Sequence, residues 1–108
     1  MPILSDVAKI LEDRKAINII TVDTRNYQNR LSDVCVIASG TSSRHMQSVA
    51  DYVYRYLKKA KLNPYIEGKS ESGWVLIEAS GIEIHLFKPE LREYYDLEEL
   101  LTSGKRPI

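Results

Sequence analysis

The stretch with the clearest capacity for chemistry runs from Ala38 to His45 and reads ASGTSSRH. It follows an apolar run and precedes a long helical pattern, and backbone amides at the start of a helix attract anions. The stretch has only one glycine, however, and it lacks both the lysine of a P-loop and the three glycines of a dinucleotide fingerprint. We therefore expect a capped helix start, with a tight turn at Gly40, rather than a phosphate site.

Catalytic and metal-binding patterns are weak in the rest of the chain. Nucleotidyl transfer also uses a Gly-Ser loop before a helix, but it needs paired acids on a neighbouring strand, and Glu83 is followed by His85 rather than by a second acid. No motif places a base beside a serine nucleophile. The single cysteine and the two histidines, 40 residues apart, have no metal-ligand spacing. We expect no catalytic residue, cofactor or metal, and hence not an enzyme.

Aromatic residues gather near the C-terminus in a pattern that is typical of a binding surface. Trp74 opens a predicted strand, where it would lie near Phe87, Pro89, Arg92, Tyr94 and Tyr95. Trp, Tyr and Arg are the residue types enriched in protein-interface hot spots. The alternative, that the tyrosines only pack the tail onto the sheet, stays open. Because the tail is also rich in acidic residues, a basic protein is the favoured partner over nucleic acid.

An α/β fold with a single mixed five-stranded sheet and flanking helices would position these groups. Helices are predicted over about 2–14 and 42–62, the second capped by Thr41 or Ser42 and buried through a stripe from Met46 to Ala60. Strands are predicted at 17–23, 33–39, 64–68, 73–79 and 82–87, with Ser80-Gly81 as a hairpin turn. The first two strands do not alternate, so both are expected to be central and buried on two faces. A turn over 89–95 and a helix from 96 complete the order α-β-β-α-β-β-β-α.

Length and composition fit one soluble domain spanning 1–108, with a frayed tail over about 103–108. The formal net charge is zero, so no global basic field would hold nucleic acid. The basic end of the 42–62 helix complements the helix dipole, and direct RNA binding there is a weaker alternative. A single cysteine, Cys35, allows no internal disulfide, and no signal peptide or membrane span is evident. We expect a cytoplasmic protein without a membrane partner.

Several segments in order resemble the ribosomal silencing factor family, also called Iojap-like proteins. They are SDVCVIASGTSSRHMQSVADYV, from Ser32, and YIEGKSESGWVLIEASGIEIHLFKPELREYYDLEELL, from Tyr65. The most specific part is IHLF, at 84–87, leading into Pro89-Glu90 and REYYDLE, at 92–98. The resemblance covers about residues 2 to 102.

The resemblance implies a function as well as a fold. It implies a nucleotidyltransferase-like fold without catalytic acids, and a repressor that binds ribosomal protein fourteen of the large subunit. Bound there, it would block joining of the small subunit and so lower translation when nutrients are short. Large-subunit assembly is the alternative role, and a nucleotide-binding enzyme of nucleotidyltransferase-like fold is a less favoured one. The resemblance also makes self-association an expectation, and a minor contact with ribosomal RNA stays open. By position, the partner surface would comprise Trp74, His85, Phe87, Pro89, Glu90, Arg92, Tyr94 and Tyr95, while Arg44 and His45 stay open as RNA contacts.

Overall fold

One five-stranded sheet organises the computed structural model, which describes residues 2–23, 25 and 33–91. Its elements are α1 (Pro2–Asp13), β1 (Ile17–Asp23), β2 (Val34–Ser39), α2 (Ser43–Lys59), β3 (Tyr65–Lys69), the short 3-10 helix η1 (Ser70–Ser72), β4 (Trp74–Ala79) and β5 (Ile82–Phe87). The spatial order is β1-β2-β5-β4-β3, in which β2 and β5 are parallel and all other neighbours are antiparallel. The predicted mixed sheet is confirmed, and the helix predicted from 96 lies outside the described residues.

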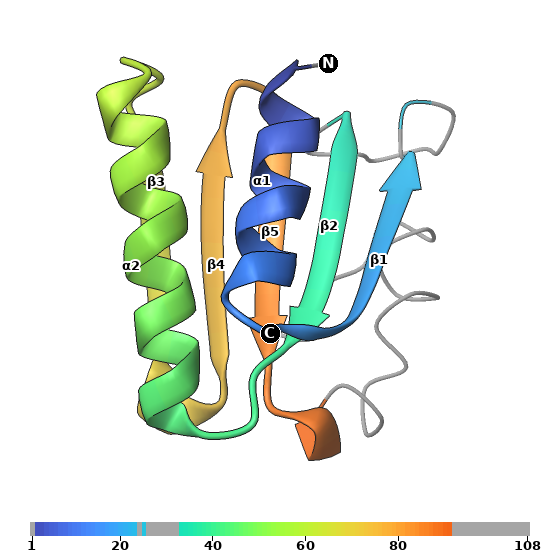
Figure 1. Cartoon of the computed structure of the whole chain (residues 1–108), viewed down its shortest axis with the longest axis vertical. Helices are drawn as coiled ribbons and strands as arrows, with labels where there is room; N and C mark the ends of the chain where they lie inside the picture. The colour runs from blue at the N-terminus through green and yellow to red at the C-terminus, as the bar shows by residue number, and fades with distance from the viewer. Residues whose placement is uncertain (1, 24, 26–32, 92–108) are drawn as a thin grey trace.

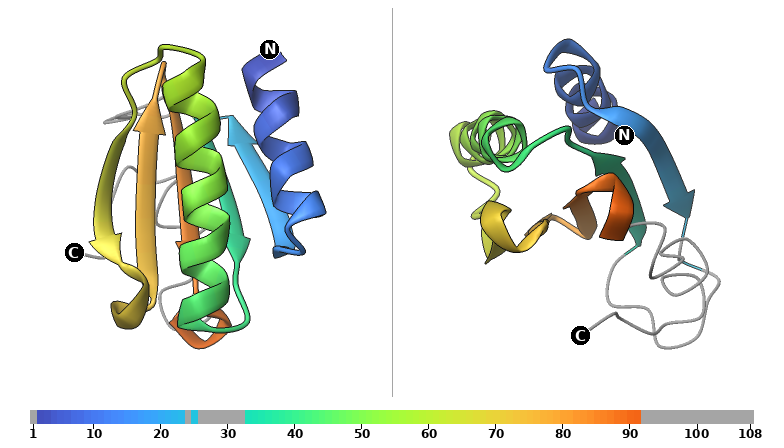
Figure 2. Two further views of the ribbon diagram at one scale, coloured as in Figure 1. Left: turned by 60° about the vertical axis from the view of Figure 1, so that its left-hand side comes forward. Right: turned by 90° about the horizontal axis from the view of Figure 1, so that it is seen from below.

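Both α-helices, α1 and α2, pack on the same face of the sheet (Figure 1). The view from below in Figure 2 shows them side by side above the strands. The predicted stripe on α2 is buried through Met46, Val49, Ala50, Val53 and Leu57, which pack on the strands below. Its last predicted member, Ala60, is exposed instead, because α2 ends at Lys59. Burying a stripe of this kind is what stabilises a helix of this length in a protein. No helix of the described residues is long and apolar enough to cross a membrane.

Two residues after the end of each helix stands a lysine with left-handed backbone, Lys15 (φ 65°) after α1 and Lys61 (φ 63°) after α2. At the end of α2, the Leu62 amide donates to the Leu57 carbonyl and the Lys61 amide donates to the Lys58 carbonyl. This is the Schellman pattern, which usually has glycine at the left-handed position. The prediction that α2 continues to residue 62 was therefore too long, because a lysine in the sequence gives no signal for this ending.

Strand β1 does not have the central position that its apolar run predicted. Within the described part of the chain it lies at one edge of the sheet and pairs only with β2, and Ile17 and Ile20 are each 39% exposed. A register shift between these two residues, with Asn18 at φ 52°, lets this strand bend at the edge. The prediction was correct for β2, whose six residues are all buried.

Candidate partner-binding face around Trp74

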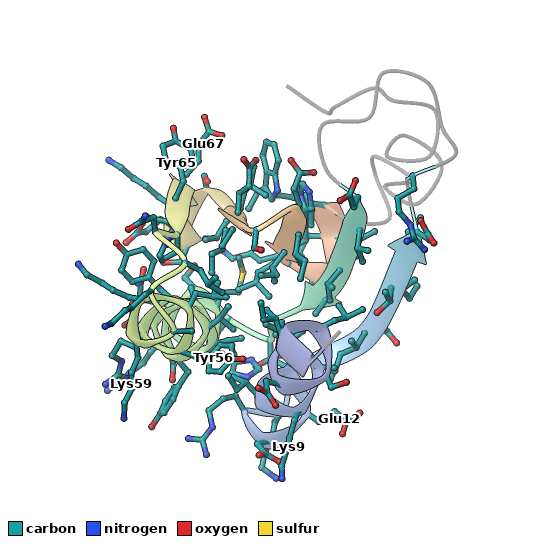
Figure 3. The ribbon with its side chains drawn as sticks, turned by 90° about the horizontal axis from the view of Figure 1, so that it is seen from above. Lys9, Glu12, Tyr56, Lys59, Tyr65 and Glu67 are labelled. Atoms are coloured by element: carbon teal, nitrogen blue, oxygen red, sulfur yellow. The ribbon has the colours of Figure 1, made fainter. Side chains whose placement is uncertain are left out.

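The sheet face opposite α1 and α2 is formed by every second residue of the strands, and its centre is Trp74. The ladder places Trp74 opposite Phe87, and Leu76 opposite His85, on the neighbouring strands β4 and β5. On β3, Tyr65 and Glu67 belong to the same face, and Figure 3 shows both side chains pointing away from the helices. This surface is hereafter called the open face. Because the open face carries polar and aromatic residues, the two faces of the sheet differ in chemical character.

Three aromatic rings on the open face lie parallel to one another. The ring centroids are 5.4 Å apart for Trp74 and Phe87, 6.0 Å for Trp74 and His85, and 6.1 Å for His85 and Phe87, with interplanar angles of 8°, 8° and 2°. His85 and Phe87 are 0% exposed, whereas Trp74 is partly exposed. Stacked rings at such distances attract one another beyond the area that they bury. Trp74 is thus the part of this cluster that a partner can touch directly.

Hydrogen bonds fix the orientation of the indole. The Trp74 Nε1–H donates to His85 Nδ1 at 3.2 Å, and His85 Nε2 lies 3.4 Å from Glu83 Oε1. An indole N–H can only donate, so His85 Nδ1 must carry no proton. The proton of the neutral imidazole is then on Nε2, from which it is donated to Glu83. The chain of donors runs from the partly exposed Trp74 to a carboxylate that is buried in the sheet.

Gly68 allows β3 to approach β4 closely beside Trp74. Its φ is +90°, and a Cβ added to it would collide with the carbonyl oxygen of Trp74. A side chain is therefore excluded at this position both by conformation and by space. Together with Glu67, Trp74 and Leu76, it lines a shallow hollow of about 20 Å³. That volume holds roughly one water molecule, so it is too small for a nucleotide.

After β5 the chain turns directly into helix at 89–91, where the sequence predicted a turn over 89–95, and this brings two further predicted residues to this end of the sheet. The Lys88 amide donates to the Gly73 carbonyl at 3.0 Å, which joins the turn to the residue before Trp74. Pro89 and Glu90 follow and are exposed. Leu91 packs with Trp74 on a small buried cluster of Cys35, Ile37 and Phe87. Arg92, Tyr94 and Tyr95 lie outside the described residues, so their predicted places in the surface stay predictions.

Glu83, Cys35 and Leu91 are residues that the sequence reasoning did not assign to the site. The ligand atoms of Cys35, Glu83 and His85 lie within 4.8 Å of one another, and all three residues are buried. The Cys35 thiol donates to the same Glu83 oxygen at 3.5 Å. The alternation of Glu83 and His85 along one strand could have paired those two. Cys35 joins them only through the parallel register of β2 and β5, which places it opposite Glu83.

Thiol, carboxylate and imidazole are also the groups that bind zinc. A metal at His85 Nε2 would require the imidazole proton to sit on Nδ1, where it would oppose the N–H of Trp74. The hydrogen bonding around His85 therefore fits a cluster of hydrogen-bonded side chains without a metal better than a metal centre.

Polar groups of the ASGTSSRH stretch form hydrogen bonds within the fold. The Ser42 Oγ caps α2 by accepting from the His45 amide at 3.0 Å. The Thr41 amide donates to His45 Nδ1 at 2.9 Å, so His45 Nε2 carries the proton that is donated to the Arg14 carbonyl at 2.8 Å. The predicted capped helix start is confirmed. The hydrogen bond of His45 to Arg14 also links the start of α2 to the end of α1. Arg44 is exposed.

Charge is divided between the two layers of the molecule. Residues 2–16 and 41–62, which include the helices, carry eight Lys and Arg against four Asp and Glu. The remaining described residues, which form the sheet and its loops, carry three Lys and Arg against seven Asp and Glu. Within the described residues, the helix layer is thus basic and the sheet with its loops is acidic. A basic partner would be attracted to the side on which Trp74 lies.

Comparison with known proteins agrees with this geometry. A crystal structure of a protein from Chromobacterium violaceum superposes with a TM-score of 0.84 at 32% identity, covering 99% of this chain and 88% of that one. The chain is 37% identical over 103 residues to the ribosomal silencing factor RsfS of Zymomonas mobilis, which covers 94% of this chain and 77% of the relative. A mouse protein named for mitochondrial assembly of the ribosomal large subunit is 42% identical over 77 residues, 68% of this chain and 34% of its own length.

The match extends over nearly the whole chain. A family model described as "Ribosomal silencing factor during starvation" matches residues 2–107. Those residues include the capped start of α2, the paired strands β4 and β5, and the turn after β5. The chain belongs to the ribosomal silencing factor family.

Proposed function

We propose that this protein represses translation by binding ribosomal protein fourteen of the large subunit and preventing the small subunit from joining. The binding surface is the open face at Trp74 with the turn at Pro89 and Glu90, and the protein acts in the cytoplasm without enzymatic activity. Family membership supports the ribosomal role. The observation that best supports this binding surface is Trp74 itself, a partly exposed tryptophan fixed by stacking and by a hydrogen bond.

The physical support for this surface comes from how interfaces obtain their affinity. A few large, rigid side chains contribute most of the binding free energy, and tryptophan is prominent among them. Trp74 is held in one orientation before any partner arrives, so little side-chain entropy is lost when it binds. The surrounding acidic charge suits a basic ribosomal protein.

Replacing Trp74 with alanine tests the proposed surface. We expect Trp74→Ala to weaken binding to large subunits by about 2 kcal/mol or more, roughly 30-fold, in sedimentation assays. Tyr52→Ala is the matched control, because Tyr52 is an aromatic residue on α2, 42% exposed, on the opposite side of the sheet. In a subunit-joining assay, wild type and Tyr52→Ala should block joining, and Trp74→Ala should not. Tight binding by a folded Trp74→Ala variant would refute the surface.

A role in large-subunit assembly is the second candidate, and the mouse relative's name favours it. It predicts that cells lacking the protein accumulate immature large subunits during growth in rich medium. Repression alone predicts normal large subunits and a failure to lower translation when nutrients run out. Sucrose-gradient profiles from the two conditions separate these roles.

Contact with ribosomal RNA would come from the basic helix side. The last turn of α2 carries Lys58 and Lys59, and Arg44 is exposed in its first turn. Such contact would make binding to large subunits more salt-dependent than binding to purified ribosomal protein fourteen. Equal salt dependence of the two would remove RNA from the interface.

A further inference from the structure

Behind Trp74, two ionisable side chains are too deeply buried for a binding protein to touch them. Glu83 and His85 have side-chain exposures of 2% and 1% and lie on β5, between β2 and β4. We propose that Glu83 and His85 are positioning residues for partner binding, which hold the Trp74 indole in its binding orientation through a directed hydrogen-bond chain. This inference rests on the proposed function of the open face, but its structural part can be tested without a partner.

The direction of the chain follows from the chemistry of its members. The indole donates to His85 Nδ1 at 3.2 Å, which leaves the imidazole proton on Nε2, facing Glu83 Oε1 at 3.4 Å. The carboxylate is an acceptor only, so it selects the tautomer that can accept from Trp74. Glu83 therefore acts on Trp74 through His85, although Glu83 and Trp74 share no hydrogen bond of their own in this chain.

The burial of Glu83 argues for a use beyond stability. Removing a carboxylate from water is costly even when it is hydrogen-bonded, and apolar side chains of similar volume often stabilise such sites at least as well. The neighbouring inward positions on the other face of β5 are Ile82, Ile84 and Leu86. A chain selected for stability alone would place residues of that kind at 83 and 85 as well.

The orientation has a consequence for what Trp74 offers to a partner. Its N–H is already engaged inside the protein with His85, which is 0% exposed. The exposed part of the ring is therefore carbon surface, and the stack with Phe87 holds the ring plane. We infer that the partner supplies an apolar pocket for the ring edge and no acceptor for the indole N–H.

Two substitutions separate the hydrogen-bond chain from packing. Glu83→Met removes the acceptor while keeping the length of the side chain, and Glu83→Gln restores an acceptor oxygen without the charge. Because Trp74 is the only tryptophan, fluorescence anisotropy and lifetime report on its mobility alone. We expect Glu83→Met to loosen the indole and to weaken binding to large subunits roughly three- to tenfold, as expected for one side chain that must be immobilised on binding. Glu83→Gln should stay within about twofold of wild type.

His85→Phe provides the independent variant, since it keeps a ring in the stack and removes the acceptor for Trp74. It should loosen the indole and weaken binding as Glu83→Met does, and urea unfolding identifies any variant that fails to fold. Wild-type anisotropy and affinity in a folded Glu83→Met or His85→Phe variant would overturn the inference. If Trp74→Ala binds normally, the proposed surface is wrong. If only Trp74→Ala is impaired, the surface stands and the positioning chain is wrong.

Discussion

Gly68 offers the sharpest test of how the strand beside Trp74 is held. In Gly68→Ala the new Cβ meets two penalties: a φ of +90°, and a collision with the Trp74 carbonyl oxygen. A non-glycine residue in left-handed backbone costs about 1–2 kcal/mol. The collision involves backbone that the ladder fixes, since Gly68 pairs with Val75 and Lys69 pairs with Trp74. Relief must disturb at least one ladder hydrogen bond, at about 1 kcal/mol or more. We expect a total loss of about 3 kcal/mol in the free energy of unfolding.

Gly81→Ala is the matched control, because its φ of +80° is similar but its surroundings differ. The nearest atom to its Cβ would be a side-chain oxygen of Asp33 at 3.1 Å, rather than backbone that is held in the strand ladder. Only the conformational penalty of about 1–2 kcal/mol should remain there. Urea unfolding, followed by far-UV circular dichroism, gives both values from the midpoints at a common slope. If the two variants lose the same free energy, the close approach at Gly68 contributes nothing and the reasoning is refuted.

Two further predictions concern the helices. Lys61→Gly should raise the free energy of unfolding by about 0.5–1 kcal/mol, because glycine adopts φ 63° without strain. Lys59→Gly, within α2, should instead lower it by about 1 kcal/mol. The 2.7 Å hydrogen bond to Asp6 raises the pKa of Tyr56. Its stabilisation is therefore present below the unfolded pKa of about 10 and lost as pH rises through the folded value. Tyr56→Phe should lose up to about 1 kcal/mol at pH 8 and lack this alkaline decline; an unchanged decline would contradict the assignment.

The local patterns of the sequence predicted most of the fold because each had one physical meaning. The stripe from Met46 to Leu57 fits only a helix with one buried side, and Ser80-Gly81 fits only a tight hairpin, in which both residues have positive φ. The apolar run of β1 was ambiguous, because an edge strand with exposed isoleucines has the same composition as a central one. The position of a strand in the sheet is set by long-range pairing, which composition does not report.

The candidate site was predictable in part for the same reason. Trp74 and Phe87 were placed together from the hairpin, and the register confirms their proximity. The burial of His85 and Phe87 and the role of Glu83 were not evident, because they depend on the parallel pairing of β2 with β5 across 48 positions. Only the three-dimensional register shows that the exposed tryptophan has a buried carboxylate behind it.

The place of β5 has a consequence for how the protein is made. Among the described strands it is the last along the chain, yet it lies in the middle, joining the pair β1–β2 to the pair β3–β4. During synthesis, neither pair can be joined to the other until residue 87 has left the exit tunnel, so the sheet cannot be completed before then. Until then, β2 and β4 each expose an unpaired edge that invites aggregation. The sheet that presents Trp74 therefore cannot be completed until the ribosome has released β5.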